Sequence, residues 1–200
     1  MRILNDMPVV DALRVVADLC CDNQIVVTNQ GSARLWPKLR RRSLDFHYNP
    51  STMSGAIPLA LGLALAQPQR EVVAVSGDGS LLMSLGSLVT VVGSGVTNLT
   101  IVLLDNGLYE VTGGQPTAGS GRVDFAGLAR AAGIGRVYAC PDLAAWEAVA
   151  AEALTSPGPV VVVLKTEGRH GQITPAPPRP MAEQIARLRT VGPPNPTRIP

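Results

Sequence analysis

Two apolar segments of the chain are each followed by a polar side chain that can bind a cation. The run Val72–Ser76 leads into Gly77–Ser80, which contains Asp78, and the run Leu99–Leu104 is followed closely by Asn106. The interval leaves room for a loop, a helix and a returning strand, so a βαβ crossover would bring both side chains to one edge of a parallel sheet. A carboxylate and a carboxamide at one edge suit a divalent cation clamped on a diphosphate.

Glycines flank this aspartate on both sides. Gly77 and Gly79 carry no Cβ, so the backbone can come close to a phosphate, and a helix starting near Ser80 would direct its amide dipole at negative charge. Ligands of open α/β sheets bind at this edge. For the tripeptide alone, an ordinary turn with a solvated aspartate is an equally good interpretation.

The two segments together resemble the metal and diphosphate signature of thiamine diphosphate enzymes. The usual signature is Gly-Asp-Gly, about two dozen residues, and then two asparagines, and this chain departs from it at Asp105. The longer run Leu104–Thr117 is similar to the branch that contains phosphonopyruvate decarboxylase and the β subunit of sulfopyruvate decarboxylase, where that departure is expected. The resemblance extends over residues 11–165 and rests on several separated motifs in the right order.

The resemblance implies a cofactor, thiamine diphosphate, and a metal, Mg²⁺. The side chains of Asp78 and Asn106 and the backbone carbonyl of Leu108 would bind the metal. The residues at this edge implied to bind the cofactor are Gly77, Gly79, Ser80, Asn106, Leu108 and Tyr109.

Two upstream segments match further parts of the family's site. Met53 corresponds to the apolar side chain that wedges between the two cofactor rings, and the carbonyl of Ser51 would accept a hydrogen bond from the aminopyrimidine. Outside this motif, Met53 would be read as a core residue that leads a helix. Thr28, Asn29 and Gly31 correspond to the other loop on the diphosphate side, although they also suit any tight turn.

The implied reaction is decarboxylation of a 2-oxo acid that carries a second anionic group, such as 3-sulfopyruvate or 3-phosphonopyruvate. Family members activate the cofactor with a glutamate from a pyrimidine-binding domain, and no glutamate of this chain lies in a segment that resembles that domain. We therefore expect an α subunit to supply it in a hetero-oligomer. Two alternatives remain open: a noncatalytic thiamine diphosphate-binding subunit, and a carboligating enzyme similar to acetolactate synthase.

Glu110 lies just after the predicted metal loop, and the resemblance includes a glutamate there. A partly buried carboxylate near a diphosphate is costly unless it is paired. We therefore predict a catalytic role in hydrogen bonding or proton transfer. The alternative is an ordinary surface carboxylate.

A run of basic residues lies between the segment that contains Gly31 and the one that contains Ser51 and Met53. It is formed by Arg34, Lys38, Arg40, Arg41 and Arg42. A solvated helix end or loop is the simpler interpretation, and the sharper one is that some of these residues bind an anionic substrate group or a partner subunit. Arg122 follows the glycine-rich stretch 119–121. That loop would close over the site in one interpretation, and in the other it is an ordinary glycine-rich loop.

Composition limits the remaining classes. The 200 residues are 46% hydrophobic and 16% charged with a net charge of +2, which argues for one folded domain and against disorder or nucleic-acid binding. No apolar stretch is long enough to span a bilayer and no signal peptide is recognisable, so we expect a cytoplasmic protein without a membrane partner. Cys20, Cys21 and Cys140 are expected as reduced core residues, and His47 and His170 are too isolated to suggest a metal site.

Other nucleotide or hydrolase motifs do not fit. Leu82 stands where a dinucleotide-binding motif that starts at Gly77 needs its third glycine, and the chain contains neither Gly-Lys-Ser/Thr nor Gly-x-Ser-x-Gly.

Periodicity and breakers predict an α/β fold, a doubly wound parallel sheet flanked by helices. Helices are expected at 11–21, 56–66, 81–92, 125–132, 143–154 and 181–189, and strands at 25–27, 72–76, 99–104, 136–139 and 159–165. Residues 1–165 would form the domain that binds diphosphate and Mg²⁺. Residues 166–200 would form a Pro-rich tail with a short helix and a mobile end, because Pro175, Pro177, Pro178 and Pro180 exclude regular structure before that helix.

Overall fold

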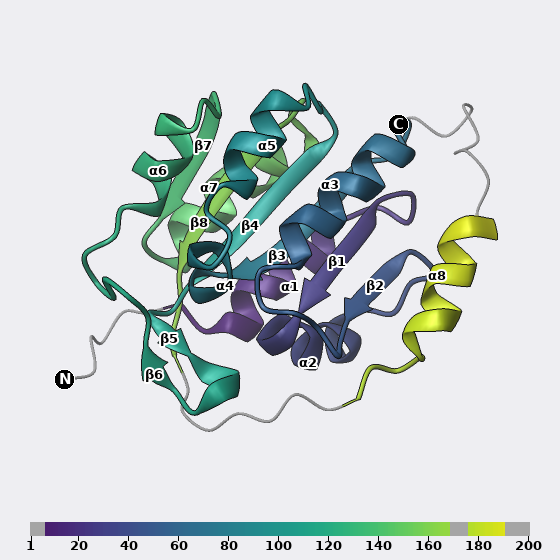
Figure 1. Ribbon diagram of the computed structural model, residues 1–200, viewed down its shortest axis with the longest axis horizontal. Coiled ribbons are helices and arrows are strands. Elements are labelled where there is room, and N and C mark those ends of the chain that lie inside the picture. The colour runs from purple at the N-terminus through teal and green to yellow at the C-terminus, as the bar shows by residue number, and fades with distance from the viewer. Residues whose placement is uncertain (1–6, 169–175, 191–200) are drawn as a thin grey trace.

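A computed structural model of the chain describes residues 7–168 and 176–190 and is built on a six-stranded parallel sheet (Figure 1). The strand order is β2-β1-β3-β4-β8-β7, and every neighbouring pair is parallel. The strands are β1 (Ile25–Asn29), β2 (Asp45–Tyr48), β3 (Val72–Gly77), β4 (Leu99–Asp105), β7 (Arg136–Cys140) and β8 (Val160–Lys165). The predicted doubly wound fold is confirmed.

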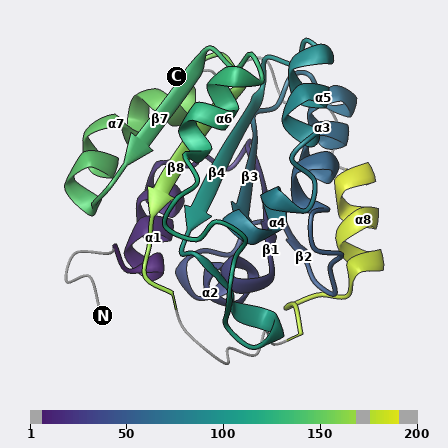
Figure 2. The same cartoon turned by 60° about the vertical axis from the view of Figure 1, so that its left-hand side comes forward.

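Helices cover both faces of this sheet (Figure 2). One face carries α1 (Val9–Leu19), α2 (Gln30–Leu39) and α7 (Leu143–Thr155), and the other carries α3 (Ala56–Ala66), α4 (Asp78–Leu82), α5 (Ser87–Gly93) and α6 (Phe125–Ala131). Successive strand residues point to opposite faces, so Val72 joins the core under α3 while Val73 joins the core under α1. Both faces are buried, which explains why the strands read as continuous apolar runs.

The predicted single helix at 81–92 is wrong in one respect, because the structure divides it into α4 and α5. A turn at residues 83–86 separates the two helices, and Gly86 is the residue just before α5. The Ser84 hydroxyl also donates to the carbonyl of Ser54, at 3.3 Å. Serine and glycine are poor helix residues, and here they allow the chain to turn right after the Gly-Asp-Gly loop.

Three regular elements were not predicted from the sequence. They are α2, β2 and a small hairpin formed by β5 (Leu108–Tyr109) and β6 (Gln115–Pro116), with a 3-10 turn at Glu110–Thr112 between its strands. Pro37 lies inside α2, and a proline read from the sequence alone argues against a helix interior. The edge strand and the hairpin strands are short, and short elements give little periodic signal.

The helix α8 (Met181–Thr190) lies along the free edge of β2 (Figure 1). The backbone N–H of His47 donates to Gln184 Oε1 at 2.7 Å, and Gln184 Nε2 donates to the carbonyl of His47 at 3.3 Å. A side-chain amide therefore takes the place of a neighbouring strand and protects an exposed sheet edge. Met181 and Leu188 pack against the core beside it.

The predicted tail agrees with the structure in its helix, which was expected at 181–189. Pro175, His170 and the end of the chain after Thr190 lie outside the described residues. The boundary predicted at residue 165, between the diphosphate-binding domain and the tail, stays a prediction. No helix in the described part of the chain has the length and apolar character needed to cross a membrane.

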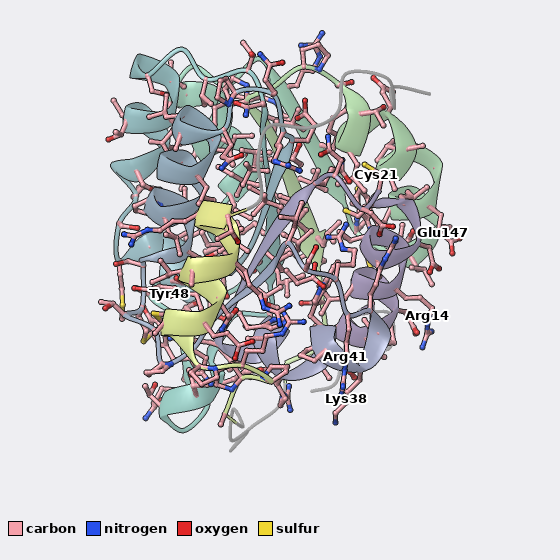
Figure 3. The ribbon with its side chains drawn as sticks, turned by 90° about the vertical axis from the view of Figure 1, so that its right-hand side faces the viewer. Arg14, Cys21, Lys38, Arg41, Tyr48 and Glu147 are labelled. Carbon is pink, nitrogen blue, oxygen red and sulfur yellow. The ribbon has the colours of Figure 1, made fainter. Side chains whose placement is uncertain are left out.

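The cysteine prediction is correct for two positions and wrong for one. Cys20 and Cys140 are buried free thiols, whereas Cys21 is an exposed free thiol (Figure 3). Burial raises the pKa of Cys20 to about 12 and that of Cys140 to about 11. Two adjacent residues just after a helix point in different directions, so only the first reaches the core.

We expect Gln184→Ala to loosen α8. The change removes both side-chain hydrogen bonds to the His47 backbone, and the local opening free energy should fall by about 1–3 kcal/mol. Hydrogen exchange of the α8 amides and of the His47 amide measures this effect. Arg189→Ala, at an exposed position of α8, is the matched control, and equal exchange in the two variants would show that apolar contacts alone hold the helix.

Candidate functional site

A cavity opens at the carboxyl ends of β1, β3 and β4, next to the point where the strand order reverses. Open α/β sheets bind their ligands at such a switch point. Most of the site residues predicted from the sequence line this cavity. They are Asn29, Gly31, Met53, Gly77, Asp78, Gly79, Ser80, Asn106, Leu108, Tyr109 and Glu110.

The sheet register explains this convergence. Gly77 at the end of β3 is aligned with Leu104 near the end of β4, so the polar residues that follow each strand emerge side by side. The helix α4 begins directly at Asp78. A Cβ on Gly79 would lie 2.4 Å from Tyr109 Cε1, so only glycine allows the Tyr109 ring to pack against this loop. A Cβ on Gly77 would have no neighbouring atom of the described residues within 4 Å.

Asp78 is the most unusual group in the cavity. Its carboxyl is buried, with 1% of the residue exposed, and Thr117 Oγ1 donates to its Oδ2 at 3.0 Å. Its Oδ1 is buried without a hydrogen-bond partner. Burial raises the pKa of Asp78 from 3.8 to about 6, the charge of Asp105 adds to the rise, and the Thr117 hydroxyl and the amides of Gly79 and Gly107 oppose it. Such an oxygen suits a cation, which would supply the missing partner.

The next strand end holds Asn106 in a fixed position. Its Oδ1 accepts a hydrogen bond from the backbone N–H of Leu108 at 2.9 Å, which forms a local turn. The preceding Asp105 is buried and forms an ion pair with Lys165, its partner in the register between β4 and β8. The position where the chain departs from the two-asparagine signature therefore links two strands.

A small hydrogen-bond network joins three segments around Ser80. Asn29 Nδ2 lies 3.3 Å from Ser80 Oγ, and the backbone N–H of Ser54 donates to the same oxygen at 2.9 Å. The loop after β1, the segment before α3 and the start of α4 are thereby held together. Met53, next to Ser54, lines the cavity from the same segment.

Two predicted site residues are not among those that line the cavity. Thr28 is fully buried, and its Oγ1 lies 3.0 Å from Nδ1 of His47. This contact joins Thr28 to its register partner in β2. Ser51 precedes Met53 in the chain and also lies outside the lining.

The structure divides the basic run by position. Arg40 donates to the carbonyl of Cys20 at 2.6 Å, and Arg42 donates to the carbonyl of Cys21 and pairs with the buried Asp45 at 2.9 Å. These two arginines therefore bind carbonyls at the carboxyl end of α1, where positive charge is favourable.

The other members of the run have different surroundings. Lys38 at the end of α2 and Arg41 just after it are both exposed (Figure 3), and Arg41 Nε donates to the carbonyl of Pro37 at 3.0 Å. Arg34 lines the cavity, but Arg122 does not.

Glu110 faces α2 across the cavity. Its Oε2 lies 3.9 Å from Nη2 of Arg34, and its side chain is 11% exposed, so the interpretation as a surface carboxylate is wrong. A Cβ on Gly31 would lie 3.3 Å from the same oxygen, so glycine leaves room for this carboxylate above the start of α2.

Sequence reasoning missed other residues around the cavity. Gln30 and Ser32 line it beside Gly31, and Thr117 contacts Asp78 from outside the lining. Gln30 and Ser32 flank Gly31, so their place beside the predicted diphosphate loop is the signal in the sequence that could have found them. Thr117 had no local signal, because its role depends on the fold of the hairpin. Among the described residues, no three His, Cys, Asp or Glu side chains gather as a metal cluster. Asp78 is therefore the carboxylate around which a cation site would form.

Comparisons with known proteins identify relatives of the chain. Residues 27–164 match the family described as "Thiamine pyrophosphate enzyme, C-terminal TPP binding domain". The chain is 42% identical over 151 residues to a phosphonopyruvate decarboxylase of Streptomyces viridochromogenes, which covers 76% of this chain and 37% of that protein. It is 38% identical over 122 residues to a sulfopyruvate decarboxylase subunit beta of Methanothermobacter thermautotrophicus, which covers 61% of this chain and 65% of that protein. The chain thus spans less than two thirds of either relative.

A solved structure shares the fold. An X-ray structure of a Mycobacterium smegmatis protein, described as a thiamin diphosphate-dependent enzyme, has a TM-score of 0.69 to this chain. The alignment covers 83% of this chain and 34% of that chain at 24% identity.

We expect Asp78→Asn to stabilise the protein in the absence of cofactor and metal. The folded state raises the pKa of this carboxyl from 3.8 to about 6, so its ionised form costs stability above pH 6, and the cost declines as the pH falls toward 4. The free energy of unfolding of the variant should exceed that of the wild type by on the order of 1–3 kcal/mol at pH 8.

Urea unfolding at pH 8, 6 and 4 measures this difference. The difference in the free energy of unfolding between the variant and the wild type should become smaller at each lower pH. Glu147→Gln, at an exposed position of α7, is the matched control and should show no such difference (Figure 3). A difference that does not change with pH would contradict the assignment of the cost to the Asp78 carboxyl.

Proposed function

The chain belongs to the thiamine pyrophosphate enzymes through their C-terminal TPP-binding domain, and we propose that its cavity holds the diphosphate end of that cofactor together with Mg²⁺. The observation that carries this proposal is the buried Oδ1 of Asp78, which has no hydrogen-bond partner at the switch point of the sheet. Mg²⁺ takes oxygen ligands and usually keeps substrate phosphates and water among them.

The donor set around Asp78 fits such a metal. Asp78 and Asn106 would bind it by side-chain oxygens, and Leu108 would bind it by its backbone carbonyl. The hydrogen bond from Thr117 to Oδ2 leaves Oδ1 of Asp78 for the cation. Gly79 lies in the first turn of α4, where backbone N–H groups that lack helical partners can bind phosphate oxygens.

The other site residues would surround the rest of the cofactor. We assign Gly77, Ser80, Asn29, Gly31 and Thr28 to the diphosphate side, the last through its place near the end of β1, just before the helix α2. Met53 would separate the two rings, Ser51 would accept a hydrogen bond from the pyrimidine through its carbonyl, and Tyr109 would lie beside the diphosphate. The network that joins Asn29, Ser54 and Ser80 would hold these segments at a constant spacing.

The proposed reaction is the decarboxylation of a 2-oxo acid with a second anionic group, such as 3-sulfopyruvate or 3-phosphonopyruvate. Bound thiamine diphosphate supplies an electron sink as CO₂ leaves. The names of the relatives support this reaction, and the name "subunit beta" supports an α subunit as partner in a hetero-oligomer. That partner would carry the pyrimidine-binding domain and the activating glutamate.

We expect Asp78→Ala to weaken binding of Mg²⁺ and thiamine diphosphate. Loss of a metal ligand should cost at least the roughly 10- to 100-fold that loss of a supporting residue costs at metal sites. Isothermal calorimetry with both ligands on the wild type and the variant measures the change, in the presence of the α partner so that both halves of the pocket are present. Glu147→Ala controls for the loss of one negative charge, and equal affinity of Asp78→Ala and wild type would refute the metal site.

We expect Glu110→Gln to lower kcat for every 2-oxo acid that the assembled enzyme accepts. A positioned proton-transfer group contributes about 10²- to 10⁴-fold to a rate, and glutamine cannot carry the proton. Release of CO₂, measured with saturating cofactor, reports the effect. A variant with wild-type kcat would remove Glu110 from the catalytic groups, whereas a wild type that binds cofactor and releases no CO₂ from either acid would remove the decarboxylase function itself.

A further inference from the structure

Charged side chains are few in the cavity, and each has a different place. The lining contains Arg34, Asp78 and Glu110. Arg34 is the one cationic side chain among the described residues that line the cavity. We propose that Arg34 binds the second anionic group of the substrate and thereby selects dianionic 2-oxo acids over pyruvate. This inference rests on the proposed function.

The geometry of α2 directs Arg34 to the site. The helix starts at Gln30, at the carboxyl end of β1, and Arg34 follows one turn later on the same side of the helix. Gln30, Gly31 and Arg34 line the cavity together, while Ala33 and Trp36 are buried in the protein. The start of α2 thus presents one long cation beside the proposed diphosphate site.

Glu110 would hold the guanidinium in place from the opposite wall. The two charges are 3.9 Å apart and come from different elements, α2 and the turn between β5 and β6. A guanidinium has five N–H donors in a planar fork, so it can contact a carboxylate on one side and an incoming anion on another. Glu110 would be a positioning residue for Arg34 in this respect, apart from its proposed proton transfer.

Burial strengthens the interaction that Arg34 would make. The side chains of Arg34 and Glu110 are only 16% and 11% exposed, and charges interact more strongly where water is largely excluded. Arginine is less strongly hydrated than lysine, and its fork matches two oxygens of a phosphonate or a sulfonate. A methyl group in the same place, as in pyruvate, would gain nothing from it.

Other cations of the described chain are poorly placed for this role. Arg40 and Arg42 bind the end of α1, and Lys38 and Arg41 are exposed (Figure 3). Lys165 pairs with Asp105 and borders a separate hollow between β8 and α6. Arg34 is therefore assigned to the substrate because of its position in the cavity, and the other residues of the basic run are not assigned this role.

The first test compares substrates. Four forms of the chain are each assembled with the α partner: wild type, Arg34→Gln, Arg34→Lys and Lys38→Gln. Each is assayed with 3-sulfopyruvate, 3-phosphonopyruvate and pyruvate. Arg34→Gln should lower kcat/KM for the two dianionic acids by about 10- to 100-fold more than for pyruvate, mainly through KM. Arg34→Lys should recover part of that preference, and Lys38→Gln, which removes one positive charge from the same helix, should keep the wild-type ratio. An equal loss for all three acids, or the same ratio in Arg34→Gln as in Lys38→Gln, would overturn the proposal.

A second test does not depend on catalysis. The chain is assembled with an α partner that lacks the activating glutamate and is loaded with Mg²⁺ and thiamine diphosphate. Calorimetry of 3-sulfopyruvate and of pyruvate should then show tighter binding of sulfopyruvate by wild type and Lys38→Gln, and loss of that difference in Arg34→Gln. If no acid is decarboxylated in the first test while this difference is present, the proposed reaction fails and the anion site stands. If wild type and Arg34→Gln bind sulfopyruvate equally, the anion site fails whatever the activity.

Discussion

The parallel pairing of β1, β3 and β4 is the constraint on which the site depends. Three strands in register end at one edge, so the residues that follow them are adjacent although they are far apart in the chain. The reversal of strand order beside β1 leaves a gap between the loops at that edge. Asn29, Asp78 and Asn106 are brought to this gap by backbone hydrogen bonds of the sheet, and any slip of the register would separate them.

Asp78 shows the cost of such an arrangement. A buried carboxylate with one oxygen unpartnered is unfavourable for the protein alone, and Thr117 and two backbone amides compensate only in part. Proteins accept a cost of this type where a bound cation repays it. The same hydrogen bond from Thr117 fixes the base of the hairpin that carries Glu110, so Asp78 and the wall of the cavity that holds Glu110 share one anchor.

Tertiary packing gave the residues of one basic run three separate roles. Arg40 and Arg42 satisfy carbonyls at the end of α1, Lys38 and Arg41 are exposed, and Arg34 lines the cavity. Nothing in the spacing of these residues distinguishes them, because the helix that separates their directions was itself hidden by Pro37. A similar limit applies to the pair of Arg34 and Glu110, whose members lie in distant segments and meet only across the folded cavity.

Local patterns in the sequence determined much of this protein. The apolar runs with glycine and aspartate at their ends predicted the parallel sheet, and the Gly-Asp-Gly motif with Asn106 predicted the cavity edge, because strand periodicity and turn chemistry are short-range properties. Tertiary structure alone decided that Thr28 turns to His47, that Thr117 supports Asp78, and that Gln184 covers the edge of β2. Each of these is a contact between residues distant in sequence, and such contacts depend on how whole elements pack, which spacing along the chain does not encode.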